Sequence, residues 1–427
     1  MPQSSQKSPK KLKILISLLY YLPHRTGLSI HVQHVAEALA ERGHQVTVLA
    51  ARHSIDLPRD ETINSVRIVR LWTPPIHMSR GMIMPLFPFA LYAFMRHYDL
   101  IFINTPMLET AIVAIVAQMT GKPVVATHHG DLILPPGLSN RIIRGVMFKF
   151  YEYMARRAAR LIAYSDDYAQ NSYYLKPFLS KVTPNYPPIK MPAPDPVRVA
   201  ELRAQWQHEG GPIIGYSGRF VAEKRPDVLL RSLEVINKRF PNARVVFAGQ
   251  YDIPYEHTWE LYQPLVQKYK DQLTFLGLIT SMEAMANFYA ACDVLVLPSD
   301  TECFALVQVE AMLSGTPVLM TDTPGGRVPV NVTGMGKIFP RGNWQALGSA
   351  VIDVLDSPEQ YTKPRAEIER IFNLDETISR YEYEFQQAVL QNRARKPRRR
   401  VPPASESGAL PVSSAPSDAS DIGSSKK

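Results

Sequence analysis

The sequence has little cysteine and no long apolar run, and each absence limits what the protein can be. Its 427 residues include only two cysteines, Cys292 and Cys303. Two thiols cannot make the disulfide framework of a small secreted domain, so we expect a reducing, cytoplasmic compartment. The most apolar stretch, residues 82–95, is interrupted by Pro85 and Pro88 and is shorter than the roughly 20 residues that span a bilayer. It is therefore either a core helix or a hydrophobic edge that dips into a membrane.

The body of the chain has no excess of positive charge, although the formal net charge is +9. The excess lies at the two ends, and residues 14–390 carry no net charge. A nucleic-acid groove needs a basic body, so no nucleic-acid partner is expected. Within this neutral body, the stretch 141–160 has a local excess of positive charge. It fits either an interfacial helix that meets anionic lipid or a core helix with a charged edge. Its charged residues are Arg141, Arg144, Lys149, Arg156, Arg157 and Arg160 against a single acid, Glu152.

The sequence also lacks G-x-G-x-x-G after its first predicted strand, which argues against a nicotinamide or flavin enzyme. Lysines followed by the apolar run 14–22 resemble a signal peptide, but no small-residue cleavage site follows. This run predicts a strand instead. A helix over 31–42 and a strand over 45–50 complete a strand, helix, strand unit, and Gly27 lies in the turn where backbone approaches a ligand.

Alternating strand and helix patterns continue on both sides of a proline-rich connector at 182–196. This alternation predicts an α/β protein with two doubly wound domains. The C-terminal tail is poor in large apolar residues. It is first basic and then rich in Ser and Pro, and this composition is typical of disorder. The expected divisions are a flexible basic start (1–11), a first domain (12–190), a second domain (191–370), a returning helix (371–390) and a disordered tail (391–427).

Two carboxylates lie in the stretch around which the second domain is organised. Glu302 follows an apolar strand at 294–297, and Glu310 lies in a helix that we expect to begin near Phe304. The unpaired amide groups in the first turn of a helix attract anions. Both acids can therefore face one ligand that carries hydroxyls and phosphate, although such pairs are also common as surface acids.

Two cations follow another strand of the second domain. Arg219 and Lys224 come after the predicted strand 212–216 and just before a helix. Fixed cations at such a strand end can hold a diphosphate and stabilise it as it leaves.

Histidines stand at a strand end of the first domain. His128, His129 and Asp131 follow the predicted strand 123–126, at the edge of a parallel sheet where ligands gather. Adjacent residues of a strand point to opposite faces, and no further Cys or carboxylate completes a zinc-like set. No metal is expected here, and a structural role for the histidines stays open.

The motifs of the second domain resemble those of family-4 glycosyltransferases. The two acids with seven residues between them are followed by Glu-Ala-Met, Gly-Thr-Pro-Val and Pro-Gly-Gly, and the resemblance extends over about 12–390. It implies the GT-B fold, in which two Rossmann-like domains face a central cleft and a C-terminal helix returns to the first domain. It also implies a nucleotide-diphosphate sugar as co-substrate, transfer with retention of configuration, and neither a metal nor another cofactor.

The resemblance assigns roles to individual residues. Glu310 would bind the ribose of the donor, while Glu302 and His129 would orient the transferred sugar. Arg219 and Lys224 would stabilise the leaving diphosphate. The remaining donor-binding positions are Gly27, Gly218, Phe304, Ala305 and Leu306.

Two positions depart from the family pattern. Ala305 stands where the family usually has Gly, which places an additional methyl group near the sugar. The pair Thr26-Gly27 keeps one of the two glycines of the family's phosphate-contacting loop.

The resulting prediction is a glycosyltransferase whose hydroxyl acceptor is lipid-linked, a glycolipid or a polysaccharide. The acceptor-receiving first domain would meet an anionic membrane surface, so the enzyme is expected to be peripheral to the inner face of the membrane. Two alternatives remain, a GT-B sugar-nucleotide isomerase (epimerase) and a catalytically inactive GT-B membrane scaffold. The donor base and sugar stay open.

Overall fold

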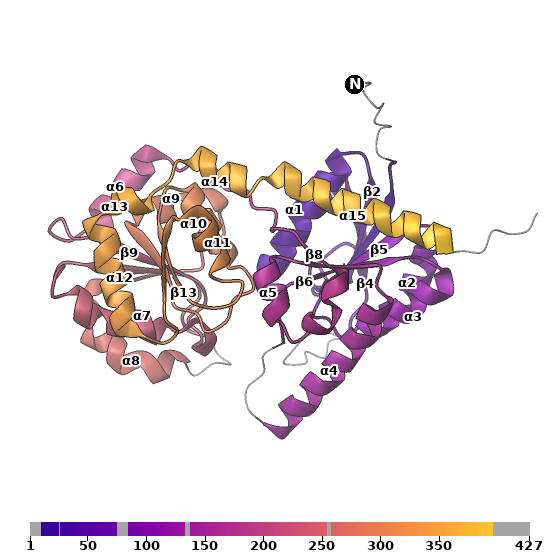
Figure 1. Cartoon of the computed structure of the whole chain (residues 1–427), viewed down its shortest axis with the longest axis horizontal. Helices are drawn as coiled ribbons and strands as arrows, with labels where there is room; N and C mark the ends of the chain where they lie inside the picture. The colour runs from indigo at the N-terminus through magenta and orange to yellow at the C-terminus, as the bar shows by residue number, and fades with distance from the viewer. Residues whose placement is uncertain (1–9, 25, 75–83, 133–136, 254–257, 396–427) are drawn as a thin grey trace, which may run out of the picture.

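The computed structural model describes residues 10–24, 26–74, 84–132, 137–253 and 258–395. Two α/β domains stand side by side, and a long C-terminal helix crosses from the second back over the first (Figure 1). The predicted GT-B fold class is therefore confirmed. Most of the predicted flexible start and of the predicted disordered tail lies outside the described residues. In the described part of the chain, no helix is long and apolar enough to cross a membrane.

The first domain is built on an eight-stranded sheet in which all neighbours are parallel except for one edge pair. Successive residues of the first strand, Leu15 and Ile16, join separate buried clusters, as expected for a sheet covered on both faces. In spatial order the strands are β3 (Asp60–Ile63), β4 (Val66–Leu71), β2 (Gln45–Ala51), β1 (Lys13–Ser17), β5 (Leu100–Thr105), β6 (Val124–His128), β7 (Arg160–Ala163) and β8 (Val182–Pro184). The helices are α1 (Gly27–Glu41), α2 (Phe87–Met95), α3 (Thr110–Thr120), α4 (Leu138–Arg157), α5 (Asp166–Asn171) and the 3-10 helix η1 (Lys176–Lys181).

The second domain has a six-stranded parallel sheet. The order reverses at β9, which has β10 on one side and β12 on the other, so the loops after β9 and β12 meet at a topological switch point. In spatial order the strands are β11 (Leu273–Gly277), β10 (Arg244–Ala248), β9 (Ile213–Ser217), β12 (Val294–Leu297), β13 (Val318–Thr321) and β14 (Gly336–Phe339). The helices are α6 (Pro196–Trp206), α7 (Pro226–Ile236), α8 (Thr258–Lys268), α9 (Met282–Ala291), α10 (Leu306–Leu313), α11 (Val328–Thr333), α12 (Trp344–Asp356), α13 (Pro358–Tyr361) and α14 (Arg365–Ile371), with 3-10 helices η2 (Ala222–Lys224) and η3 (Lys270–Gln272).

Some elements differ from those predicted from the sequence. Strands β3, β4, β8 and β14 were not predicted. Strand β8 occupies the first three residues of the predicted connector 182–196, because this segment pairs with β7 at the edge of the first sheet. The hairpin between β3 and β4 turns at Asn64 and Ser65, whose φ angles of 48° and 64° are typical of a tight turn that matches strand twist. Helix α4 begins earlier than predicted, at Leu138, and ends at Arg157, because Arg160 opens β7.

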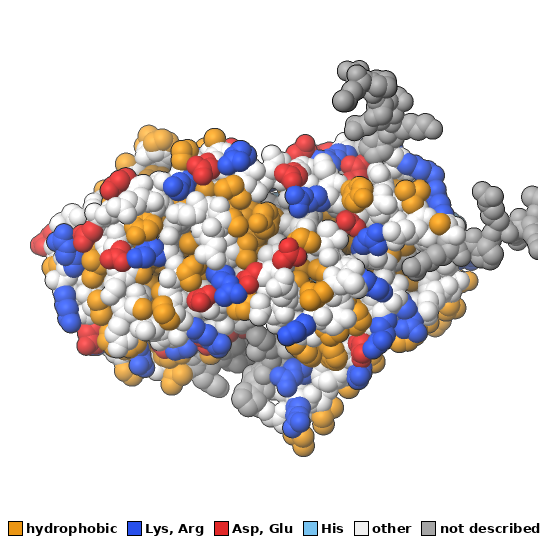
Figure 2. Space-filling view, viewed as in Figure 1, with side chains coloured by type: hydrophobic (Ala, Val, Ile, Leu, Met, Phe, Trp, Pro, Cys, Tyr) orange, Lys and Arg blue, Asp and Glu red, His pale blue; other side chains and the backbone are white. Residues whose placement is uncertain are grey.

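Helices α2 and α4 expose apolar side chains on the first domain. In the described part of the apolar stretch 82–95, Phe87, Leu91 and Met95 are buried in the core, whereas Phe89 is 75% exposed. The core-helix interpretation therefore holds for the buried face, and contact of the exposed face with a membrane stays a prediction. Helix α4 projects from the domain, and apolar and basic side chains mix over its projecting end (Figures 1 and 2). Its exposed apolar side chains are Leu138, Ile142, Ile143, Val146 and Phe150.

The C-terminal helix α15 (Leu374–Arg395) packs on the first domain and runs beyond the predicted end at residue 390. Its Tyr381 and Phe385 are fully buried beside Phe102 of β5, with ring centroids 5.6 and 5.1 Å from that ring. The second half of the chain thus supplies part of the core of the first domain.

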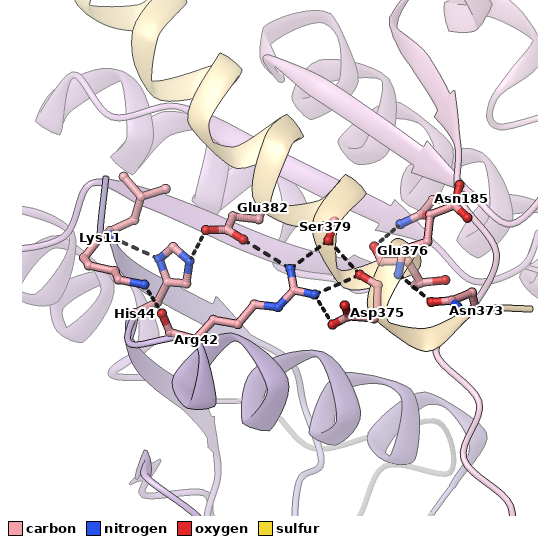
Figure 3. A network of polar contacts seen from close by, with 11 residues as sticks. Lys11, Arg42, His44, Asn185, Asn373, Asp375, Glu376, Ser379 and Glu382 are labelled. Atoms are coloured by element: carbon pink, nitrogen blue, oxygen red, sulfur yellow. Dashed lines mark hydrogen bonds and ion pairs between the residues drawn. The ribbon is translucent and has the colours of Figure 1, made fainter. Parts of the chain in front are cut away.

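A polar network fixes the start of α15 (Figure 3). Arg42, at the end of α1, donates to the carbonyl oxygen of Asp375 at 2.8 Å and to the carboxylate of Glu382 at 3.2 Å. His44 lies on the other side of Glu382, with its Nε2 3.0 Å from the carboxylate, while its Nδ1 accepts from the amide of Leu12. Burial lowers the pKa of His44, so the neutral ring donates to Glu382 through Nε2.

Candidate active site

The N-terminal end of α10 forms the centre of the site. Ala305 caps the helix with φ 56° and ψ 78°, in the left-handed region, and no side chain caps it. Amide groups of the first turn are therefore left for water or an anionic ligand. The helix begins at Leu306 rather than near Phe304 as predicted. Phe304 is fully buried, with its ring 6.0 Å from that of Tyr164, so a donor can meet only its backbone.

Glu302 and Lys224 form a direct ion pair in front of this helix. Lys224 Nζ lies 2.5 Å from Glu302 Oε1, and only 26% and 11% of the two side chains are exposed. The pair joins the loop after β9 to the loop after β12, which the strand order makes neighbours. Burial alone would lower the pKa of Lys224, but the charge and hydrogen bond of Glu302 raise it overall. The lysine therefore keeps its charge beside the acid that the resemblance places at the sugar.

Glu310 lies one helical turn further into α10. Its Oε2 accepts a hydrogen bond from the hydroxyl of Tyr289 at 2.9 Å, and that hydroxyl is 3.2 Å from Ser217 Oγ at the end of β9. Burial raises the pKa of Glu310, and the bond from Tyr289 lowers it in part. The sequence analysis missed Tyr289, because no local pattern indicates that α9 faces this acid.

The backbone of the loop after β9 lies directly against the backbone of the loop after β10. A side chain at Gly249 would place its Cβ 2.2 Å from the carbonyl oxygen of Gly218, so glycine is required where these loops touch. Arg219 follows with a half-exposed side chain, 3.5 Å from Glu223 Oε1. Its guanidinium lies in the same loop as Lys224, as predicted.

A second ion-pair network braces this loop. Arg225 has a left-handed backbone, with φ 48°, and its guanidinium binds Asp227 at 2.9 Å and Asp300 at 3.3 Å. Asp300 also binds Arg341 at 2.9 Å. These contacts tie the loop carrying Lys224 to the loop carrying Glu302, which keeps the two side chains in register.

His129 is held between two protein partners in the first domain. Its Nε2 is 2.9 Å from Asn104 Oδ1, and its Nδ1 is 2.5 Å from the hydroxyl of Tyr164. Burial and the neighbouring ring of His31 lower the pKa of His129 well below its usual range, so the imidazole is neutral. Both ring nitrogens are thus engaged within the protein, and a contact with the donor sugar stays a prediction.

Gly27 lies across the cleft from α10. It begins α1, whose N-terminus is closed by a capping box between Thr26 and Ser29. A Cβ at Gly27 would lie 3.9 Å from Leu306 Cδ1, so the first turn of α1 adjoins the first turn of α10. The structure therefore brings Gly27 and Leu306 together from the two domains. Over the described ranges, no three His, Cys, Asp or Glu side chains gather as a metal site would.

Comparisons with known proteins match both domains of the chain to glycosyltransferases. Residues 25–172 match the family model described as Glycosyltransferase Family 4, and residues 199–370 match that of Glycosyl transferases group 1. The chain is 28% identical over 335 residues to D-inositol 3-phosphate glycosyltransferase of Thermobifida fusca, covering 70% of this chain and 73% of the relative. It is 25% identical over 363 residues to phosphatidyl-myo-inositol mannosyltransferase of Mycobacterium leprae, covering 81% and 89%.

The fold is shared with solved enzymes as well. Sucrose-phosphate synthase of Thermosynechococcus elongatus superposes with a TM-score of 0.72 at 22% identity, covering 89% of this chain and 100% of that one. The two family models divide the chain as its two sheets do, one model to each domain. The protein therefore belongs to the family-4-like glycosyltransferases of the GT-B fold.

Proposed function

We propose that the protein transfers a sugar from a nucleotide-diphosphate donor to a hydroxyl acceptor with retention of configuration, at a membrane surface. The observation that carries the proposal is the Lys224–Glu302 pair at the open end of α10. A leaving diphosphate needs fixed positive charge, and Lys224, Arg219 and the free amide groups of α10 supply it. When the donor binds, the ammonium group of Lys224 would contact both the diphosphate and Glu302.

The contacts of Glu302 and His129 within the protein limit the roles that these residues can have in the reaction. Glu302 is held by Lys224, so it is placed to orient sugar hydroxyls rather than to attack carbon. In a front-face reaction, the acceptor oxygen bonds to the anomeric carbon as the bond to the diphosphate breaks on the same face. The leaving phosphate oxygen takes the acceptor proton. An isomerase would need additional acid and base groups, and the ring of His129 already has both nitrogens bound.

The acceptor is a polyol presented near lipid. Two relatives carry inositol in their names, one as a phosphate and one as a phosphatidyl compound, which supports an acceptor of that class. Helix α4 supports the membrane location, because its exposed Ile142, Val146 and Phe150 stand among basic side chains.

Two measurements test the proposal: the anomeric configuration of the product and the turnover of a Lys224 variant. The donor would be found by screening uridine and guanosine diphosphate sugars, and proton NMR of the product should show the anomeric configuration of the donor. Lys224→Ala should lower turnover by about 100-fold, the scale of one lost transition-state donor. Lys268→Ala, a surface lysine of the same domain, should match the wild type. An inverted product would refute retention, and a folded Lys224→Ala enzyme with wild-type turnover would refute the charge-stabilising role.

A further inference from the structure

A cavity of about 510 Å³ lies between the two domains beside Glu302. Its first-domain wall includes Asp131 after β6, Arg144 of α4 and Tyr173 after α5, and its second-domain wall comes from the loops after β12 and β13. This volume is within the range of small-molecule sites. Because Glu302 is the proposed sugar contact, a molecule in this cavity would lie next to the transferred sugar. That is the place of an acceptor.

The acids that line this cavity are already bound by other side chains. Asp131 Oδ1 lies 2.9 Å from His128 Nε2, and Asp300 Oδ1 lies 2.9 Å from Arg341 Nε. The third acid, Glu302, is held by its lysine. Asp300 and Glu302 each face a cation of the protein, and Asp131 accepts hydrogen bonds from His128, Ser172 Oγ and the amide of Tyr173, so all three carboxylates are engaged within the protein.

Arg144 differs from the acids because no carboxylate pairs with it among the residues that the structure describes. On the same helix Lys149 pairs with Glu152 at 2.9 Å, whereas Arg144 is exposed at the cavity. Burial raises the pKa of Tyr173, and the charge of Arg144 opposes that rise, which places the two side chains near each other. Tyr173 is fixed by stacking on Phe148, with ring centroids 4.8 Å apart.

The two walls offer different chemistry to one ligand. A guanidinium and a phenolic hydroxyl on the first-domain side donate hydrogen bonds, and a guanidinium fork fits the oxygens of a phosphate ester. Thr301 on the opposite side can bond to hydroxyls, next to Glu302. A ligand that fits both walls carries a phosphate at one end and hydroxyls at the other.

We propose that this cavity is the acceptor site and that Arg144 binds a phosphate ester of a hydroxyl-rich acceptor, with an acceptor hydroxyl directed to the sugar beside Glu302. The inference rests on the proposed function and adds the substrate class and its anchoring residue. A soluble polyol phosphate and a phospholipid head group present the same chemistry to Arg144. The experiment therefore has one arm for each source.

The test uses calorimetry on the full chain saturated with UDP or GDP, whichever it binds. The soluble probes are myo-inositol and myo-inositol 1-phosphate, and the lipid probe is phosphatidylinositol in neutral detergent micelles. One phosphorylated probe should bind about tenfold or more tightly than myo-inositol, the scale of a charge-assisted hydrogen bond. Arg144→Gln should remove that preference. Arg141→Gln removes the same charge one turn earlier on α4 and outside the cavity lining, so it should keep the affinity for the soluble probe within about twofold of the wild type.

The outcomes separate this inference from the proposed function. Preference for the soluble phosphate assigns a free polyol phosphate, and preference confined to the micelles assigns a lipid head group. Equal losses in both arginine variants, or no preference for either phosphorylated probe, would overturn the role of Arg144. Failure of the wild type to bind either nucleotide would instead contradict the proposed function, because that measurement does not involve the acceptor.

Discussion

At the scale of the residue, Ala305 is one of the non-glycine positions that depart from a low-energy backbone. Its φ of 56° lies in a region that costs an L-residue about 1–2 kcal/mol, and glycine adopts it freely. The sequence identified Ala305 as a departure from the family, and the structure supplies the physical consequence. The strain lies at the capping residue that opens α10 toward the donor.

Ala305→Gly should therefore stabilise the protein. Relief of the strain exceeds the extra freedom of glycine in the unfolded chain, about 0.4–1 kcal/mol, so the thermal midpoint should rise by about 2 °C. Ala311→Gly, within the same helix, provides the matched control and should lower the midpoint, because glycine costs about 1 kcal/mol in a helix interior. A fall in both variants would show that the left-handed conformation of Ala305 is not strained.

At the scale of the element, strong local patterns could be predicted from the sequence and weak ones could not. The apolar run of β12 and the helix that carries Glu310 were expected at nearly the observed positions. The edge strand β3 alternates between exposed and half-buried residues and carries little apolar signal. The ion pair of Lys224 and Glu302 spans 78 residues and depends on β9 lying next to β12, which no local pattern reveals.

Helix α4 is the element whose surface bears on the membrane proposal. Leu138, Ile142 and Val146 are exposed at four-residue spacing, so they form one stripe along the helix. Salt screens the attraction of basic residues to anionic lipid but does not screen the insertion of apolar side chains. The two contributions can therefore be separated by substitution and ionic strength.

We expect the protein to bind phosphatidylglycerol vesicles at low salt and to retain part of that binding at high salt. Arg156→Glu with Arg157→Glu should remove mainly the salt-sensitive part, and Ile142→Ser with Val146→Ser the salt-resistant part. Vesicle cosedimentation measures both. Leu261→Ser changes an apolar residue of the second domain that is at least as exposed, and it should have no effect.

The vesicle assay needs a control without the C-terminal tail, because the basic residues of the tail could themselves attract anionic lipid. The chain should be truncated after residue 395 rather than 390, because Asn392 of α15 donates to the carbonyl oxygen of Gly121 at 2.9 Å. If this truncated protein ignores anionic vesicles at low salt, the described body has no membrane face. A soluble acceptor would then be the better hypothesis.

At the scale of the whole molecule, an ion pair links the two domains beside the cavity proposed for the acceptor. Arg327 of the second domain binds Asp167 of α5, with Nη2 2.6 Å from Oδ1 and Nε 3.1 Å from Oδ2, and the amide of Gly325 donates to Oδ2 at 2.7 Å. Burial alone would raise the pKa of Asp167, but Arg327 and this amide lower it overall. A lowered carboxylate pKa means that the contact is complete above the usual range of Asp and is lost only as the pH falls through the lowered value. This ion pair is therefore insensitive to pH near neutrality.

Breaking this contact should shift the molecule toward an open arrangement. Arg327→Gln should increase the radius of gyration of the nucleotide-free protein in small-angle scattering, because a partly exposed pair contributes up to about 1 kcal/mol, or about fivefold in the ratio of closed to open molecules. The swapped pair Asp167→Arg with Arg327→Asp should restore much of the compact state, since the charges again attract. Arg239→Gln removes an arginine that pairs with Asp356 at 3.0 Å within the second domain, and it should leave the scattering unchanged. Identical curves for Arg327→Gln and the wild type would mean that α15 and the packing around Phe304 hold the domains closed without this ion pair.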